Sequence, residues 1–561
     1  MQQRPGVPAA EPDRTLADRV RRAALDRPDR PALIWYDRTI TWSELDDAVD
    51  RVAAALAAHA PPTGDHPARI AVALPNSPDF AVAFFAILRA GLVAVPVNPG
   101  FTPPELRHVL SDSGASVLIG TDRVCDVVAG LRSELPALTT VLGSLPTGVD
   151  GVRAEPVPVD REALALLLYT SGTEGRPKGA MLSHRALLAN HEQIDRIEPT
   201  VLGSDDTALL ALPFFHAYGL NSGLGAVAYH GACGVLVERF DPGEALSVIA
   251  RHQVTVLVGV PSMFLGWSLL PDLDEAMATV RVAVCGAAPL ENSTASRFTE
   301  ATRHPVFVGY GLTETAPVLT STLVSPVAKA GSIGRAIPGV EVRLVAAAGE
   351  TVWAGADTGP GYDDPDEPYL DLESAGTDPG EIVVRGANLF SGYWPDGRGG
   401  PDPAGWWATG DIAYADADGD LFLVDRLGEL ILVNGFNVYP HEVELAIEAH
   451  PGIAESAVVG IPHPYTGQTV KAYAVRVPGA AVGAEELLEH CERNLARFKC
   501  PTAVEFVAEL PHSAIGKVRK TMLRTGTTGA PGPAGDPGPA DAPAMPVGGP
   551  ATEPTEVPDA R

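Results

Sequence analysis

Cysteine is scarce in this chain of 561 residues, which contains five. The five are dispersed along the chain, with no CxxC pair and no zinc-like spacing among them. A disulfide framework favours an even set of cysteines, and a structural zinc site needs closely paired ligands. The cysteine pattern therefore argues against both classes and predicts free thiols in a reducing compartment.

Long apolar runs are missing as well. A membrane-spanning helix is read from about 18 or more consecutive apolar residues, and no such run occurs in the sequence. Residues 1–30 alternate charged residues with alanine and lack the apolar core of a signal peptide. We therefore expect a cytoplasmic protein without a membrane-spanning segment.

Positive charge is in short supply. Lys and Arg number 41 against 70 Asp and Glu, which gives a formal net charge of −29 at pH 7. Such a chain is repelled by nucleic acid and by anionic membranes, so neither is expected as its main partner. A bound phosphate must then be held by local cations, by backbone N–H groups or by a metal ion.

The order of apolar segments predicts an α/β protein with more than one domain, because 561 residues exceed one hydrophobic core. Short β-branched strands alternate with helical stretches, which predicts a large N-terminal domain (residues 1–424) of layered, mostly parallel sheets. From about residue 340 the strands alternate polar and apolar positions, which indicates a β-rich subdomain. The acidic, Gly- and Pro-rich segment at about 347–379 predicts a mobile surface insertion.

A second compact pattern follows Asp425. It predicts a small C-terminal α+β domain over residues 425–524, with a hinge at Asp425–Arg426. Residues 525–561 are rich in Pro, Gly, Ala and Thr and have no hydrophobic period, so they predict a disordered tail.

The segment Tyr169–Gly179, YTSGTEGRPKG, follows directly on the apolar run at 163–168. A turn rich in Ser, Thr and Gly at a strand end offers hydroxyl and backbone N–H groups to phosphate oxygens. Lys178 adds a positive charge. The segment is not a Walker A loop, because Lys178 is preceded by Pro177 and followed by Gly179. It predicts a phosphate-binding loop of another kind.

Further motifs accompany this loop in a fixed order. They are PFFHAYG (213–219), CGAAP (285–289), YGLTET (310–315), GSIGRAIPG (331–339), TGD (409–411), DR (425–426), GFNVYP (435–440) and IGKVRK (515–520). Together they resemble the adenylate-forming superfamily of acyl-CoA synthetases, peptide-synthetase adenylation domains and luciferases. The resemblance spans roughly residues 14–524, apart from the insertion. It implies ATP-dependent activation of a small-molecule carboxylic acid as acyl-AMP, followed by transfer to coenzyme A.

The resemblance also implies a role for individual residues. Small residues after the CGAAP strand would admit adenine, Asp411 would accept the ribose hydroxyls, and Glu314 would hold Mg²⁺. Lys517 would bridge the attacking carboxylate and the nucleotide as charge shifts. The predicted catalytic residues are Lys517, His216, Glu314 and Thr313. The predicted ATP- and AMP-binding residues are Thr170, Ser171, Gly172, Thr173, Glu174, Gly175, Lys178, Gly286, Ala287, Ala288, Tyr310, Gly311, Thr313, Asp411 and Arg426.

The acid and the thiol acceptor are less closely specified. No acidic residue stands in PFFHAYGLNSGLG, so a free amino acid is not expected, and the predicted acyl pocket is His216, Tyr218, Gly219, Gly223 and Val260. Its apolar character predicts a fatty or aryl acid. A medium- or long-chain fatty acid is preferred because no basic residue marks a second polar end.

The resemblance places the pantetheine path along Gly435, Phe436 and Asn437, reached when the small domain rotates about its hinge. The acceptor is predicted to be CoA, with an acyl carrier protein as the alternative. A non-enzymatic nucleotide sensor is a third hypothesis, and Lys517 and Glu314 argue against it.

Overall fold

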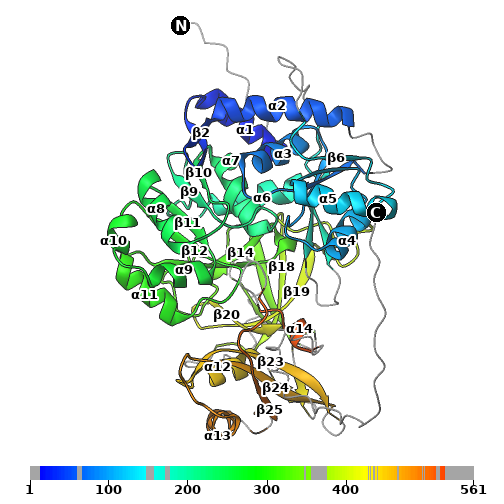
Figure 1. Ribbon diagram of the computed structural model, residues 1–561. Helices are drawn as coiled ribbons and strands as arrows, with labels where there is room; N and C mark the ends of the chain where they lie inside the picture. Colours follow the sequence, from blue (N-terminus) through cyan, green and yellow to red (C-terminus); the bar gives the residue numbers. More distant parts are fainter. Residues whose placement is uncertain are drawn as a thin grey trace, which may run out of the picture.

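The structure is a computed structural model in which a large upper body stands on a small lower domain (Figure 1). It describes residues 13–59, 66–146, 157–170, 177–346, 349–355, 376–426, 429, 431–433, 436–438, 440–463, 467–495, 497, 499–512 and 518–524. The predicted tail, residues 525–561, and most of the predicted insertion lie outside the described residues.

One layer of the large body is a sheet of six strands in the order β6-β5-β3-β4-β7-β8, counted over the described residues. All neighbours run parallel except β7 and β8, which form an antiparallel hairpin around the phosphate-loop motif. The strands are β3 (Arg69–Ala73), β4 (Val93–Pro96), β5 (Val117–Gly120), β6 (Thr140–Leu142), β7 (Leu164–Thr170) and β8 (Lys178–Ser183).

A second layer is a nine-stranded sheet, again counted over the described part of the chain, in the order β15-β14-β13-β12-β11-β9-β10-β1-β2. Its centre is parallel, so the carboxyl ends of β9, β11, β12 and β13 meet at one edge. Ligand sites form at such edges. The strands are β1 (Pro31–Trp35), β2 (Arg38–Thr41), β9 (Thr207–Leu210), β10 (Cys233–Leu236), β11 (Val256–Gly259), β12 (Val282–Cys285), β13 (Val306–Gly311), β14 (Val318–Ser321) and β15 (Arg335–Ala336).

Helices cover these sheets, and α3 shows how the layers join. Ser77 caps it by accepting a hydrogen bond from the backbone N–H of Phe80, and Pro78 opens its first turn. Ten of its twelve residues are buried, as expected of a helix packed on all sides. The helices are α1 (Leu16–Asp26), α2 (Trp42–His59), α3 (Pro78–Arg89), α4 (Pro103–Ser113), α5 (Asp122–Gly130), η1 (Arg132–Glu134), α6 (His184–Ile194), η2 (Tyr218–Gly225), α7 (Ala226–His230), α8 (Pro242–His252), α9 (Pro261–Ser268), α10 (Leu273–Ala276), α11 (Asn292–Thr302) and η3 (Thr313–Thr315).

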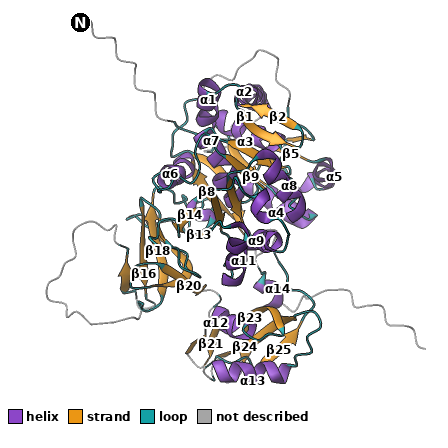
Figure 2. Cartoon of the chain, turned by 90° about the vertical axis from the view of Figure 1, so that its left-hand side faces the viewer, coloured by secondary structure: helices purple, strands orange, loops and turns teal. Residues whose placement is uncertain are grey.

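The predicted β-rich subdomain is a five-stranded antiparallel sheet of described residues, seen beside the main body in Figure 2. Its strands are β16 (Val340–Val345), β17 (Thr351–Ala354), β18 (Gly380–Gly386), β19 (Trp406–Ala415) and β20 (Leu421–Arg426). The start of the predicted insertion is corrected here, because β17 pairs with β16 and places Trp353 opposite Leu344. Residues 349–355 therefore belong to the sheet or to its turns.

The small domain lies below the large body and forms its own hydrophobic core. Its described elements are β21 (Ile431–Val433), β22 (Phe436–Val438), α12 (Pro440–Glu448), β23 (Ile453–His463), β24 (Gly467–Arg476), α13 (Ala484–Asn494), β25 (Ala503–Phe506) and α14 (Lys520–Arg524). The predicted hinge residues, Asp425 and Arg426, end β20 immediately before this domain. The α/β fold class, with its large layered domain and small α+β domain, is confirmed.

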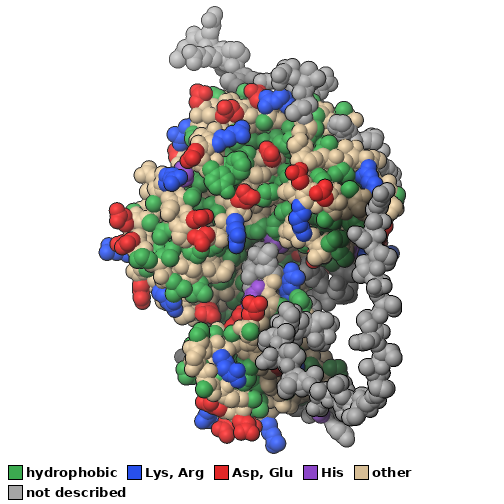
Figure 3. Space-filling view, in the orientation of Figure 1, with side chains coloured by type: hydrophobic (Ala, Val, Ile, Leu, Met, Phe, Trp, Pro, Cys, Tyr) green, Lys and Arg blue, Asp and Glu red, His purple; other side chains and the backbone are tan. Residues whose placement is uncertain are grey.

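Two further observations concern membrane-spanning helices and the charges on the surface. No helix among the described residues is long and apolar enough to cross a membrane. On the face shown in Figure 3, acidic and basic side chains are interspersed rather than gathered by sign.

Candidate active site

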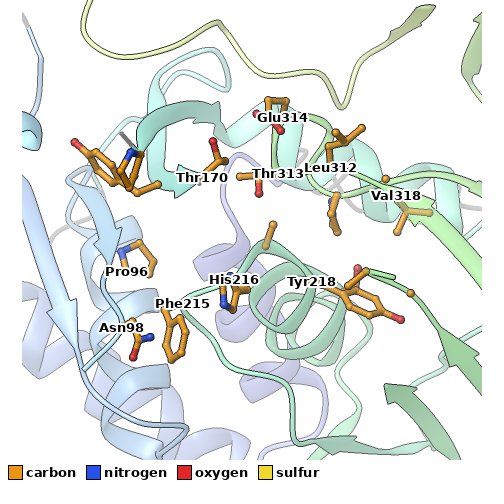
Figure 4. Close-up of a pocket in the computed structure, with 18 of the residues that line it drawn as sticks. Pro96, Asn98, Thr170, Phe215, His216, Tyr218, Leu312, Thr313, Glu314 and Val318 are labelled. Carbon is orange, nitrogen blue, oxygen red and sulfur yellow. The ribbon is translucent and has the colours of Figure 1, made fainter. Parts of the chain in front are cut away.

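A cavity of about 1400 Å³ lies at the carboxyl ends of the central strands, and residues of the small domain form part of its wall. Figure 4 shows Thr170, Thr313 and Glu314 along one side of it, with Phe215 and His216 across from them. The phosphate-loop, YGLTET and aromatic–histidine motifs, far apart in the sequence, therefore meet around one space.

The phosphate-loop motif is held at its base by the β7–β8 hairpin. Thr170 ends β7, Lys178 begins β8, the two lie opposite each other in register, and both line the cavity. Tyr169 donates a hydrogen bond to Asp112 Oδ2 at 2.7 Å, and burial together with this carboxylate raises the pKa of Tyr169. His108 Nε2 lies 2.8 Å from the carbonyl oxygen of Pro177. Ser171, Gly172, Thr173, Glu174 and Gly175 lie outside the described residues and remain predictions.

The predicted adenine and ribose residues follow two neighbouring strands. Gly286 and Ala287 come after β12, Tyr310 and Gly311 end β13, and all four line the cavity. A Cβ on Gly286 would lie 3.1 Å from the Tyr218 ring, so only a glycine fits without movement. Ala288 is not among the cavity-lining residues in the described part of the chain.

Asp411, in the TGD motif, is buried on β19. The Tyr310 hydroxyl donates to Asp411 Oδ2 at 2.7 Å, which joins the adenine strand to the predicted ribose acceptor. Arg426 lies directly opposite Asp411 in the β19–β20 ladder. The hydrogen bond orients one carboxylate oxygen before any ligand arrives.

Glu314 is buried in the short helix η3 and lines the cavity next to Thr313. The Tyr393 hydroxyl donates to its Oε1 at 2.7 Å, and Lys178 Nζ lies 5.7 Å from the centre of the Tyr393 ring. No described residue donates a hydrogen bond to Glu314 Oε2. A buried carboxylate with one oxygen held by a hydrogen bond and the other without a donor among the described residues is a suitable ligand for Mg²⁺.

A second group of carboxylates, Asp416, Asp418 and Asp420, also comes together. Lys329 Nζ lies 2.6, 2.6 and 3.2 Å from their oxygens, so an ammonium group already neutralises them. This cluster fastens the β19–β20 turn to the loop after β14. The predicted metal site therefore rests on Glu314.

The small domain contributes Glu429, Val518, Arg519, Lys520 and Met522 to the cavity wall. Lys520 Nζ forms ion pairs with Glu429 Oε2 at 3.0 Å and with Glu444 Oε1 at 2.7 Å. These pairs connect the segment after the hinge with the segment after the IGK motif.

Several predicted residues of this domain are not described. Lys517 and Gly435 lie outside the described residues, although Val518, next to Lys517, lines the cavity. The side chains of Asp425, Arg426, Phe436 and Asn437 are outside the description as well, and their roles remain predictions.

The predicted acyl pocket is partly relocated. His216 and Tyr218 line the cavity, and burial lowers the pKa of His216 to about 4, so the imidazole is neutral at pH 7. Gly219, Gly223 and Val260 are not among the described residues that line it. A Cβ on Gly219 would lie 2.4 Å from the Pro213 carbonyl oxygen, so this glycine permits close backbone packing rather than leaving room for an acid.

The apolar part of the cavity runs along the sheet toward the amino ends of its strands. Ala208, Val256, Val258 and Val284 form an apolar wall, and α6 with the following loop adds Ile194, Ile197, Val201 and Leu202. Two histidines, His191 and His230, also line this part of the cavity, and burial lowers the pKa of both, so neither adds a basic group there.

The residues that sequence reasoning missed support the predicted ones through long-range contacts. Tyr393, Asp112 and His108 belong to none of the recognised motifs. A local pattern exists for one further group of cavity-lining residues. The spacing of four between Tyr218, Ser222, Ala226 and His230 is that of one helix face, but four glycines nearby weaken the helix prediction.

Comparisons with known proteins agree with this geometry. The family model described as AMP-binding enzyme matches residues 20–394, and that of the AMP-binding enzyme C-terminal domain matches residues 442–517. A feruloyl-CoA synthase from Amycolatopsis sp is 37% identical over 513 residues, which cover 90% of this chain and 97% of that protein. A long-chain-fatty-acid–CoA ligase from Bacillus subtilis is 31% identical, with 91% and 94% covered.

Solved structures of similar shape include complexes with ATP and with anthranoyl-AMP. ATP-bound MatB from Rhodopseudomonas palustris superimposes with a TM-score of 0.79 at 30% identity, covering 92% of this chain and 99% of that one. The anthranilate CoA ligase AuaEII with anthranoyl-AMP gives 0.77 at 26% identity, covering 91% and 96%.

Proposed function

This chain belongs to the family of AMP-binding enzymes, and from that premise we propose how its cavity serves an AMP-forming acyl-CoA ligase. Formation of an acyl-CoA is the activity named for its relatives, a CoA synthase and a CoA ligase. The finer proposal is that the acid has an extended, apolar acyl body. It rests on the wall that runs along β9, β11 and β12 beneath the nucleotide end.

In the first half-reaction, a carboxylate oxygen of the acid bonds to the α-phosphorus of ATP and pyrophosphate leaves. Both partners are anions, so catalysis depends on positioning and charge neutralisation. Thr170, Lys178 and Thr313 surround the phosphate region, and Asp411 accepts the ribose hydroxyls. Mg²⁺, held by Glu314, supplies further positive charge when bound.

In the second half-reaction, the thiol of CoA attacks the acyl carbonyl carbon and AMP leaves. None of the described residues of β21 and β22 lines the cavity, whereas the segment after Lys517 does. We propose that this arrangement serves adenylation and that rotation of the small domain about Asp425 brings the Gly435 loop to the acyl group for thioester formation. CoA is the proposed acceptor, with an acyl carrier protein as the alternative.

The acyl body can be of two kinds. A medium- or long-chain fatty acid fits the apolar wall, because that wall reaches from the carboxyl ends of the strands to Ala208 and Val256 near their amino ends. An extended aryl acid is the second candidate, favoured by the aromatic and polar side chains of Tyr218 and His230, which also line the cavity.

The test is carboxylate-dependent exchange of labelled pyrophosphate into ATP, with C4–C18 alkyl acids and cinnamic acids as the panel. Exchange that rises with the length of the acid supports the proposal. Exchange with short acids alone, or with none of the panel, contradicts it. Thioester assays with free CoA and with a phosphopantetheinylated carrier protein then decide the acceptor.

A further inference from the structure

The end of helix α4 is fixed in place beside the phosphate-loop hairpin. Arg69, a buried residue of β3, donates from Nε to the carbonyl oxygen of Ser113 at 2.6 Å and from Nη2 to that of Gly114 at 3.2 Å. Helix α4 ends at Ser113, so these hydrogen bonds tie its last turn to the sheet. The same guanidinium lies 5.1 Å from the centre of the Trp394 ring. The end of α4 is therefore a firm support for the segments that it contacts.

From this support, Asp112 is connected to both strands of the hairpin. Its Oδ2 accepts the hydrogen bond from the hydroxyl of Tyr169, which precedes Thr170 on β7, at 2.7 Å. Its backbone carbonyl oxygen accepts from Trp394 Nε1 at 2.9 Å. The backbone N–H of Trp394 donates in turn to the carbonyl oxygen of Gly179, on β8, at 2.8 Å. One residue of α4 therefore holds the strand before the loop directly and the strand after it through a tryptophan.

The packing between these contacts is tight. A Cβ on Gly179 would lie 3.2 Å from the Tyr169 ring and 3.4 Å from Trp394 Cβ, so these three residues are in close contact. One turn earlier on α4, His108 Nε2 lies 2.8 Å from the carbonyl oxygen of Pro177. Side chains four positions apart share one face of a helix. One face of α4 therefore contacts the chain on each side of the phosphate-loop motif.

The position of Asp112 is unfavourable for a carboxylate that has no other use. Asp112 lines the same cavity as Thr170 and Lys178, where phosphate groups are proposed to bind, and like charges repel. Its side chain is exposed, so the hydrogen bond to Tyr169 adds only modestly to the stability of the fold. A role in arranging the phosphate site accounts for a carboxylate at this place.

Building on the proposed function, we propose that Asp112 is a positioning residue for ATP. Its contacts with Tyr169 and Trp394 set the separation of Thr170 and Lys178, which lie opposite each other where the hairpin opens. These two residues bind the β- and γ-phosphates, whereas Asp112 itself touches no part of the nucleotide. Loss of its side chain therefore weakens the binding of ATP and spares AMP, which lacks those phosphates.

The experiment measures Kd for ATP and for AMP, each with Mg²⁺, by equilibrium dialysis. The proteins are wild type, Asp112→Ala, Asp112→Asn, Tyr169→Phe and the variant that combines Asp112→Ala with Tyr169→Phe. We expect Asp112→Ala and Tyr169→Phe each to raise Kd for ATP roughly tenfold, the effect of one hydrogen bond to a charged group. The combined variant should lose no more than the weaker single variant, because both changes remove the same contact.

Two further results separate positioning from a general loss of structure. Asp112→Asn keeps an acceptor oxygen for the Tyr169 hydroxyl, so it should lose less ATP affinity than Asp112→Ala. Kd for AMP and the melting temperature should stay near wild type in all variants. Asp126→Asn is the matched control and should change neither Kd, because it removes an exposed carboxylate from α5, which packs against α4.

The sign of the effect decides between positioning and charge. If Asp112 acted through its charge alone, Asp112→Ala and Asp112→Asn would both tighten ATP binding. An unchanged or tighter Kd for ATP in Asp112→Ala overturns the inference, as do equal losses for ATP and AMP or additive losses in the combined variant. Failure of the wild-type protein to bind ATP would instead contradict the proposed function.

Discussion

The two ends of the cavity differ in whether their polar side chains are hydrogen-bonded within the protein. At the nucleotide end, Tyr310 is hydrogen-bonded to Asp411, and Tyr393 to Glu314, before any ligand binds. At the acyl end, the hydroxyls of Tyr218 and Ser222 have no partner among the described residues. The nucleotide end is therefore preorganised by hydrogen bonds within the protein, whereas part of the other end is not.

This contrast predicts that changes at the nucleotide end affect all acids alike. Lys517→Ala should have the largest effect, slowing acyl-adenylate formation by roughly 10²–10³-fold for every acid, because one preorganised charge is lost. Conversion of supplied acyl-adenylate and CoA to thioester should stay near the wild-type rate. Single-turnover assays from both starting points measure this.

Lys471→Ala is the control for this change, since Lys471 lies in the same domain and pairs with Glu505 on its surface. A loss of both half-reactions in folded Lys517→Ala would show that the small domain does not use separate faces.

Changes at the acyl end should instead discriminate between acids. Ala226 begins α7 and lines the cavity, so Ala226→Phe places a ring in the cavity. We expect this overpacking to lower kcat/KM for a C12 acid by roughly 10–100-fold. Turnover of a C4 acid should fall much less. Ala250→Phe, on the exposed side of α8, is the control, and equal losses for both acids would break the distinction between the two ends.

A smaller effect should come from the group that orients Glu314. Tyr393→Phe keeps the ring beside Lys178 but removes the hydroxyl, so we expect a roughly tenfold fall in kcat/KM for all acids, as for one hydrogen bond to a charged group. The Mg²⁺ concentration needed for half-maximal rate should rise. Tyr36→Phe, at an exposed tyrosine, controls for ring substitution. An effect that depended on the acid would contradict a role at the nucleotide end.

The smallest effect concerns stability and pH. Burial lowers the pKa of His191, on the acyl wall, to about 3, while an unfolded histidine titrates near 6.5. Below pH 6.5 the histidine is protonated in the unfolded chain but stays neutral in the folded chain. Its contribution to the free energy of unfolding is therefore fully present above pH 6.5 and is lost as the pH falls. The slope is at most about 1.4 kcal/mol per pH unit for one histidine.

Urea unfolding at pH 7 and pH 5 measures this slope. His191→Gln should reduce the loss of unfolding free energy between the two values by about 2 kcal/mol. Identical pH dependence in wild type and variant would show that His191 does not make the acyl end sensitive to acid.

Much of the fold was readable because its signals are local. The alternation of β-branched strands with helices and the change of pattern near residue 340 both appear in the structure. The nucleotide-end motifs follow the carboxyl ends of strands. Because these ends meet at one edge of a parallel sheet, the position of each motif after a strand also indicates its place in the fold. The strand at Thr351–Ala354 was missed because an acidic, glycine-rich segment follows it.

The sequence by itself determined the family, the layered α/β architecture and the nucleotide-end motifs, since each depends on residues close together in the chain. Only the tertiary structure decided which surfaces face the acid. The Tyr393–Glu314 contact joins residues 79 positions apart, and the apolar wall gathers single residues from separate strands. Gly219 and Ser222 stand in one short motif, yet packing turns one against the sheet backbone and the other toward the cavity. That choice depends on the burial of distant elements against each other, which no local pattern encodes.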